Sequence, residues 1–350
     1  MFKLFISKDS LTDLYVNHAA SPTDWLKVIQ KQRKLFLMND ESDIDADLSD
    51  ANSMLSMFLI ATGKSFDIFE PSSLSISDIH DNPARVLENP CGCYLLDIDK
   101  AEAESIQNNY GVICQSTSDY QDCPLVFEEF PISPSNGEKG YGWDRFKSFC
   151  SKIPSNSIII NDRNLFSNQS EHELHGLENV GEILKATLPD ALNTAYHVGI
   201  IFGSENGKPN IGAPHNFVEI AEKLNSIKQE LNRPYPIYFS LLMLNDQDGT
   251  NWEKTHNRRI ISNYYLGIAD RKIAAFWKGR SLCSQTINFV PLYCKGLNNG
   301  ADAPEKDHFQ TIEGYQFIVY NWYSDPKNRF ASGLNTDTAS IENINHRLLK

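Results

Sequence analysis

The chain has 350 residues, of which 41% are hydrophobic and 11% aromatic, and its formal net charge is −13. This composition can fill folded cores and excludes a disordered chain, and no run of about 18 apolar residues predicts a membrane helix. The length suits two or three domains, and the apolar N-terminal stretch is too short for a secretory signal. Seven cysteines without a Cys-x-x-Cys pair indicate reduced thiols. We therefore expect a cytoplasmic protein with no membrane association.

The charge is unevenly distributed along the chain. Residues 1–150 hold 24 acidic and 12 basic residues, whereas residues 151–350 hold 21 and 20. Within residues 251–295, eight Lys or Arg stand against only Glu253 and Asp270. A nucleic acid or another phosphate-bearing partner is therefore expected to bind through residues 251–295, and not through the acidic N-terminal part.

The first elements predict a mixed α/β fold. Met1–Ile6 is typical of a strand, and a helix is predicted to begin after Thr23, whose side chain can cap it. The acidic stretch Asp43–Asp50 is interpreted as a loop before a buried helix that includes Met54–Ile60.

A strand–helix–strand unit follows and favours a parallel sheet. Cys93–Ile98 is the first strand, a helix covers Asp99–Asn109, Gly111 ends it, and Val112–Cys114 is the second strand. Asp97 and Asp99 follow the first strand, where α/β folds often place metal-binding acids. Capping of the helix by Asp99 explains the same residues, so both interpretations stay open.

The segment Pro131–Gly142 contains two Pro and three Gly, which is typical of a linker. We place the domain boundary there. The prediction is an acidic α/β domain of residues 1–135 followed by a second α/β domain of residues 136–350.

The second part alternates strands with amphipathic helices, which predicts a mixed sheet flanked by helices. The first strand, Ser157–Ile160, leads into Asn161-Asp162-Arg163. Helices are expected over residues 176–188 and 215–232. Strands are expected over residues 157–160, 196–202, 235–244, 256–265, 272–277, 286–293 and 316–322.

The best chemical candidate is the segment Thr255–Tyr265. If it is a strand, His256 and Arg258 share one face and Arg259 lies on the other. A guanidinium can neutralise two phosphate oxygens, and a neutral His can attack phosphorus or carry a proton. A His–Arg pair that only satisfies loop carbonyls at a strand edge explains the pattern equally well.

From Ser157 onward, the order of elements and the late His256-x-Arg258 motif resemble the phospholipase-D-like superfamily, over residues 150–325. The signature of that family is His-x-Lys followed after four residues by Asp. Here Arg258 stands in place of the Lys and Asn263 in place of the Asp. The resemblance implies a phospholipase-D-like fold and a nuclease or phosphodiesterase that needs no metal or cofactor. It makes His256 the nucleophile or proton carrier, Arg258 the phosphate clamp and Asn263 a positioning group.

We further expect Arg259, Arg271 and Lys272 to bind the substrate. Members of this family need two His motifs, so the resemblance implies a homodimer that brings two copies of His256 together. It also suggests a role in nucleic-acid processing or antiviral defence.

Two other hypotheses stay open. In the first, the chain is a non-catalytic subunit that holds nucleic acid or a protein through residues 251–295. In the second, a metal-dependent nuclease uses Asp97 and Asp99. Two weaker signals are a His172/His175 pair, interpreted as solvated, and Gly203–Lys208, which lacks the full phosphate-loop spacing.

Overall fold

The chain divides into two compact units, Met1–Val126 and Phe127–Lys350. The structure is a computed structural model. It describes residues 3–18, 23–32, 34–38, 41–117, 123–127, 130–132, 142–166, 175–204, 217–245, 258–277, 280–281, 286–291, 293–294, 317–334 and 346–349.

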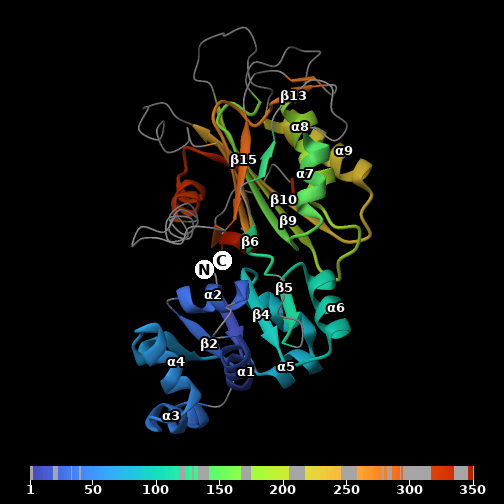
Figure 1. The fold of residues 1–350 in the computed structure, drawn as a ribbon. Helices are drawn as coiled ribbons and strands as arrows, with labels where there is room; N and C mark the ends of the chain where they lie inside the picture. The colour runs from blue at the N-terminus through green and yellow to red at the C-terminus, as the bar shows by residue number, and fades with distance from the viewer. Residues whose placement is uncertain are drawn as a thin grey trace. The chain divides into compact units, whose positions relative to one another are not determined.

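The first unit is built on a five-stranded parallel sheet in the order β3-β2-β1-β4-β5 (Figure 1). The strands are β1 (Lys3–Ile6), β2 (Leu35–Leu37), β3 (Phe69–Pro71), β4 (Gly92–Leu96) and β5 (Ile113–Ser116). The chain leaves β1 towards β2 on one side and returns to β4 on the other. The strand order therefore reverses between β1 and β4, as in doubly wound α/β folds.

Helices pack on both faces of this sheet. They are α1 (Lys8–His18), α2 (Asp24–Lys31), α3 (Glu41–Ser49), α4 (Met54–Thr62), α5 (Ile76–Asp81) and α6 (Lys100–Tyr110), with short 3₁₀ helices at Phe66–Ile68 and Pro83–Glu88. On one face, Phe5 stacks on Tyr94 at 4.8 Å between ring centroids, and Ile106 of α6 joins the same core. On the other face, Trp25 Nε1 of α2 donates to Gln115. Neighbouring residues of β5 point to opposite faces, which separates these two contacts.

Local sequence predictions for this unit are confirmed where capping residues decide them. Thr23 caps α2 by accepting from the N–H of Leu26 at 3.2 Å. Gly111 ends α6 with φ 63° in the left-handed region that glycine favours.

The structure changes two interpretations of acidic residues in this unit, those of residues 43–50 and of Asp99. The stretch expected as a loop is helix α3, because Ile44 is buried and Asp47 pairs with Lys8 at 3.0 Å. Asp99 stands at the N-cap of α6 but its side chain makes no capping hydrogen bond.

The second unit contains an eight-stranded mixed sheet in the order β17-β10-β9-β8-β11-β12-β15-β7. Strands β8 (Ser157–Asn161), β9 (Tyr196–Ser204) and β10 (Ile237–Asn245) are parallel neighbours. The antiparallel strands are β11 (Arg258–Ser262), β12 (Tyr265–Ala269), β15 (Ile287–Pro291), β7 (Phe130–Ile132) and β17 (Arg329–Ser332). Short strands of this unit are β13 (Phe276–Trp277), β14 (Arg280–Ser281) and β16 (Tyr293–Cys294), and the short strand β6 (Val126–Phe127) contains the division between the two units.

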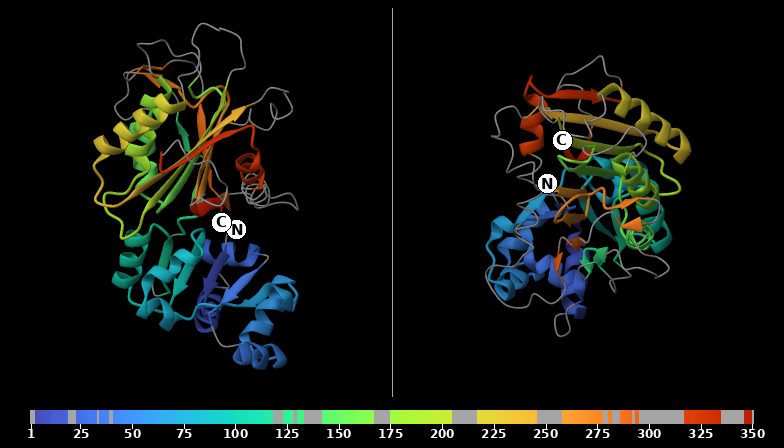
Figure 2. Two further views of the ribbon diagram at one scale, coloured as in Figure 1. Left: turned by 180° about the vertical axis from the view of Figure 1, so that it is seen from behind. Right: turned by 90° about the horizontal axis from the view of Figure 1, so that it is seen from above.

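Helices cover both faces of the large sheet. On one face lie α7 (Trp143–Cys150), α8 (His175–Thr187) and α9 (Phe217–Leu231); the helix over residues 317–324, red in Figure 1, lies on the other (Figures 1 and 2). Aromatic rings join α7 to the sheet, since Phe146 stacks on Phe289 at 4.2 Å. A single turn, Arg347–Leu349, follows His346, whose ring lies against Gly199 of β9. The chain is therefore a mixed α/β protein with one parallel and one mixed sheet.

The elements around α8 and α9 match the sequence predictions closely, but others do not. Residues 317–324 form a helix where a strand was expected, because the buried Val319, Trp322 and Tyr323 follow helical spacing. Of the strand expected over residues 272–277, only Phe276–Trp277 is extended.

The expected linker is partly a strand. Pro131 and Ile132 belong to β7, the outermost strand of the sheet, where a proline costs no interior hydrogen bond. Residues 133–141 of the expected linker lie outside the described residues. Within the described part of the chain, no helix is long and apolar enough to cross a membrane.

Candidate phosphate-binding edge

The parallel strands β8, β9 and β10 all end at one edge of the large sheet, which we call its carboxyl edge. Strand β11 runs antiparallel to β8 and therefore begins there, with Arg259 opposite Asn161. Strand β12 returns to the same edge, with Ala269 opposite Arg258. The topology thus brings three segments together: residues 161–164, the start of β11, and residues 270–273. Ligands of α/β sheets commonly bind at such an edge.

These three segments carry several cations. We define the cationic edge as the five residues Arg163, Arg258, Arg259, Arg271 and Lys272. The carboxylates within the same three segments are Asp162 and Asp270, so the described part of this edge has a net positive charge. Four of the five cations come from the basic segment that the sequence identified.

Arg258 and Arg259 point to opposite faces because side chains alternate along a strand. Arg258 Nη1 donates to the carbonyl of Asp270 at 2.9 Å, and its Nε lies 3.6 Å from the carboxylate of Asp162. Arg259 Nη1 donates to the carbonyl of Arg258 at 3.1 Å. Arg271 is exposed, and Lys272 is partly buried.

The sequence analysis did not select Arg163. Its carbonyl accepts from the N–H of Gly203 at 2.9 Å, and its side chain crosses β9 above that glycine. A Cβ on residue 203 would lie 2.6 Å from Arg163 Cγ, so a side chain there would displace the arginine. The sequence signal was available, since Arg163 follows a buried strand and Gly203 lies near the end of another.

The sequence analysis also noted Asp162 only as the end of a strand. Its side chain is fully buried and accepts from the N–H groups of Ile273 at 2.7 Å and Asn164 at 2.9 Å. Burial raises the pKa of Asp162, and the hydrogen bonds and nearby Arg258 counter that effect only in part.

Asn263 does not lie with Arg258. It follows the far end of β11, about 17 Å away at the usual rise per residue. There Asn263 is buried, and its Oδ1 accepts from the N–H groups of Asn156 and Ser157 at 3.0 and 3.1 Å. These contacts tie the start of β8 to the turn after β11. The role of a positioning group beside Arg258, predicted for Asn263, does not fit this placement.

His256 and His172 lie outside the described residues, so the catalytic role predicted for His256 stays a prediction. His175 begins α8. His346 is fully buried: its Nε2 lies 3.1 Å from the carbonyl of Ile158, and its Nδ1 accepts from the N–H of Leu348 at 3.3 Å. Burial lowers the pKa of His346 to about 4, which keeps the ring neutral at neutral pH.

The carboxyl edge of the small sheet offers a different set of groups. Asp97 and Asp99 are both exposed there, and the hydroxyl of Thr117 approaches Asp97 at 3.5 Å. Among the described residues, no three His, Cys, Asp or Glu side chains gather as metal ligands would. The metal site proposed from Asp97 and Asp99 therefore has no third ligand in the described part of the chain.

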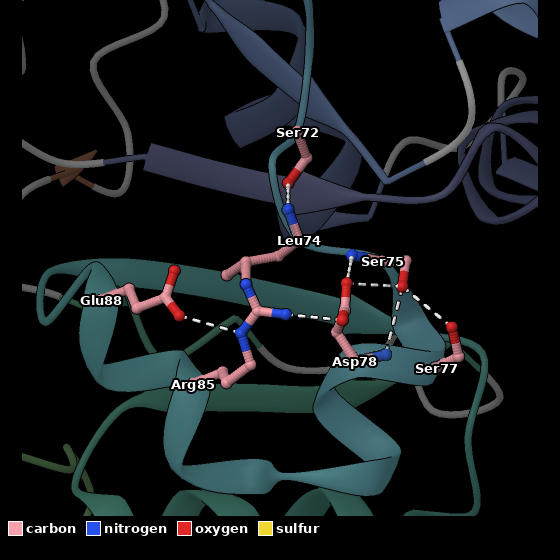
Figure 3. A network of polar contacts seen from close by, with 7 residues as sticks. All are labelled: Ser72, Leu74, Ser75, Ser77, Asp78, Arg85 and Glu88. Atoms are coloured by element: carbon pink, nitrogen blue, oxygen red, sulfur yellow. Dashed lines mark hydrogen bonds and ion pairs between the residues drawn. The ribbon is translucent and has the colours of Figure 1, made fainter.

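Charges near the end of β3 are compensated by one another. Arg85 lies between two carboxylates, with Nη1 at 2.5 Å from Asp78 and Nε at 2.9 Å from Glu88 (Figure 3). Asp78 also forms a capping box with Ser75, which fixes the start of α5. This network is structural, because each of its charges already has a partner of opposite sign.

No protein-family model matches the chain, and no curated protein is significantly similar to it in sequence. The geometry described above is therefore the basis for a functional proposal. The class that it defines is a two-unit α/β protein with a cationic sheet edge.

Proposed function

We propose that the second unit binds nucleic acid through its phosphate backbone, at the cationic edge. The observation that supports this most is the convergence of Arg163, which follows β8, with four cations that lie about 100 residues later in the chain. The guanidinium groups offer paired N–H donors that suit phosphate oxygens. The chain as a whole has a net charge of −13, which repels a polyanion. The cationic edge is a local exception and would therefore attract a polyanion to this part of the protein.

The test is the salt dependence of binding to a labelled single-stranded oligothymidylate. Each phosphate contact on a single strand contributes about −0.7 to the slope of log affinity against log salt. Replacing both Arg258 and Arg259 by Ala should therefore make the slope shallower by about 1.4 and weaken binding at low salt.

The matched control is the double variant Lys27→Ala, Lys34→Ala. It removes the same charge from the first unit, where Lys27 pairs with Asp24 and Lys34 pairs with Glu70. This control should retain the full slope. An equal effect of the two double variants, or no binding by the unaltered protein, would refute the proposal.

A hydrolytic role at the same edge is the second candidate. It is favoured by the His256-x-Arg258 motif, whose Arg belongs to the cationic edge. In a phospholipase-D-like reaction, one His attacks phosphorus and a second protonates the leaving group, so two chains would be required. The variant His256→Ala should then abolish cleavage of the oligonucleotide in the presence of EDTA and leave its binding intact. A chain that binds without cleaving is instead a binding subunit.

A further inference from the structure

Asp162 is a carboxylate placed where the proposed function needs positive charge. It lies within the cationic edge, 3.6 Å from Arg258 Nε, and its side chain is fully buried. By charge alone, this carboxylate would repel a phosphate and weaken binding. Burying a charged group is also unfavourable unless other groups compensate it. We therefore expect Asp162 to have a role other than direct contact with a ligand.

The contacts of Asp162 join the three segments of the edge. One oxygen, Oδ1, accepts from the N–H of Asn164, which fixes the turn that follows β8. The other, Oδ2, accepts from the N–H of Ile273, 111 residues away in the chain. The guanidinium of Arg258 is held between this carboxylate and the carbonyl of Asp270.

Each of these contacts fixes a backbone that carries cations. Arg163 lies between Asp162 and Asn164, so the turn at Asn164 orients it. Arg271 and Lys272 immediately precede Ile273, so the bond to Ile273 places them beside β11. The buried carboxylate of Asp162 thus fixes the position of every cation of the edge except Arg259.

We propose that Asp162 is a positioning residue for phosphate binding, which holds the cations of the edge in place beside one another. This rests on the proposed function, because it assigns a role within the same site. The positioning role and the charge of Asp162 act on affinity in opposite directions. That difference in sign makes the two separable by experiment.

The experiment compares Asp162→Asn with Asp270→Asn. Both variants remove one negative charge from the same edge, but the side chain of Asp270 is exposed whereas that of Asp162 is buried. Binding of the labelled oligothymidylate is measured across a salt series, below the thermal unfolding midpoint of each variant. Asp270→Asn should bind equally well or more tightly. Asp162→Asn should bind at least about tenfold more weakly, with a slope shallower by at least about 1.4, since at least two of the four cations that it positions lose their phosphate contacts.

Tighter binding by both variants would overturn the inference, because charge would then be the only effect of Asp162. An unchanged slope in Asp162→Asn, together with a lowered unfolding midpoint, would also overturn it and leave a purely structural role. If the unaltered protein does not bind, the proposed function itself fails.

Should Asp162→Asn not fold, hydrogen exchange on the unaltered protein decides the question. The N–H of Ile273 should exchange slowly, and more slowly still with oligothymidylate bound. Exchange of Ile273 that is fast, or that the oligonucleotide leaves unchanged, would refute the positioning role.

Discussion

Both units contain parallel strands that end in polar residues, but the two carboxyl edges have different charges. At the small sheet, Asp97 and Asp99 are exposed, and the nearby Lys8 pairs with Asp47 at 3.0 Å. At the large sheet, the cations outnumber the carboxylates in the described residues. The residues that follow the parallel strands therefore have different charges in the two units. A net positive charge at such an edge suggests a binding site for an anion, whereas exposed carboxylates do not.

The comparison extends to the buried titratable groups. In the first unit these include Cys93, Cys114 and Tyr94, which are neutral in acid at their ordinary pKa values, and burial raises those pKa values further. In the second unit, burial lowers the pKa of His346 to about 4. Acid should therefore act on the two units differently.

The largest expected effect is the loss, in acid, of the stability that neutral His346 gives to the second unit. His346 is neutral when folded and has an unfolded pKa near 6.5, so unfolding takes up a proton between pH 6.5 and pH 4. The contribution of neutral His346 to stability is thus present above this window and falls by about 3 kcal/mol as the pH falls through it. Unfolding monitored by hydrogen exchange at pH 7 and pH 4 should show this loss around β8 and β9. The variant His346→Gln, which cannot titrate, should lose less; an equal loss in both proteins would exclude His346 as the cause.

A smaller effect is expected at the cationic edge from Gly203→Ala. The new Cβ would lie 2.6 Å from Arg163 Cγ, which forces Arg163 from its place across β9. We expect a loss of about 2 kcal/mol in stability and of one phosphate contact in the salt slope. The control is Gly181→Ala on α8, where the nearest atom would be 3.9 Å away and a helical alanine should stabilise. Unchanged binding by Gly203→Ala would remove Arg163 from the site.

The smallest effect is expected at the acidic edge of the first unit. Asp97→Asn with Asp99→Asn should change stability by less than about 0.5 kcal/mol, because both side chains are exposed. Oligonucleotide binding should keep the same salt slope. The unfolding midpoint of the unaltered protein should be the same with Mg²⁺ as with EDTA. Mg²⁺ could instead raise the unfolding midpoint of the unaltered protein and leave that of the double variant at its EDTA value. That result would mean that these acids bind a cation, and that the small-sheet edge is also a binding site.

Local sequence patterns determined the elements whose ends and faces they mark. The apolar spacing of α9, the cap at Thr23 and the glycine after α6 each act within one or two turns, so they can be recognised without the rest of the chain. Predictions were wrong where long-range packing decided the outcome. The acidic residues of α3 form a helix beside Lys8, and Pro131 joins a sheet through pairing with Asn288.

The sequence by itself determined that a basic segment follows the last parallel strand, and it picked out four of the five cations. Only the tertiary structure decided which residues share the site. Strand register brings Asp162 and Arg163 beside β11, and the direction of β11 carries Asn263 to the opposite end of the sheet. A linear pattern gives spacing along one strand, whereas a site at a sheet edge depends on the register and direction of several strands. Those are set by contacts between residues about 100 positions apart, which a single segment of sequence does not contain.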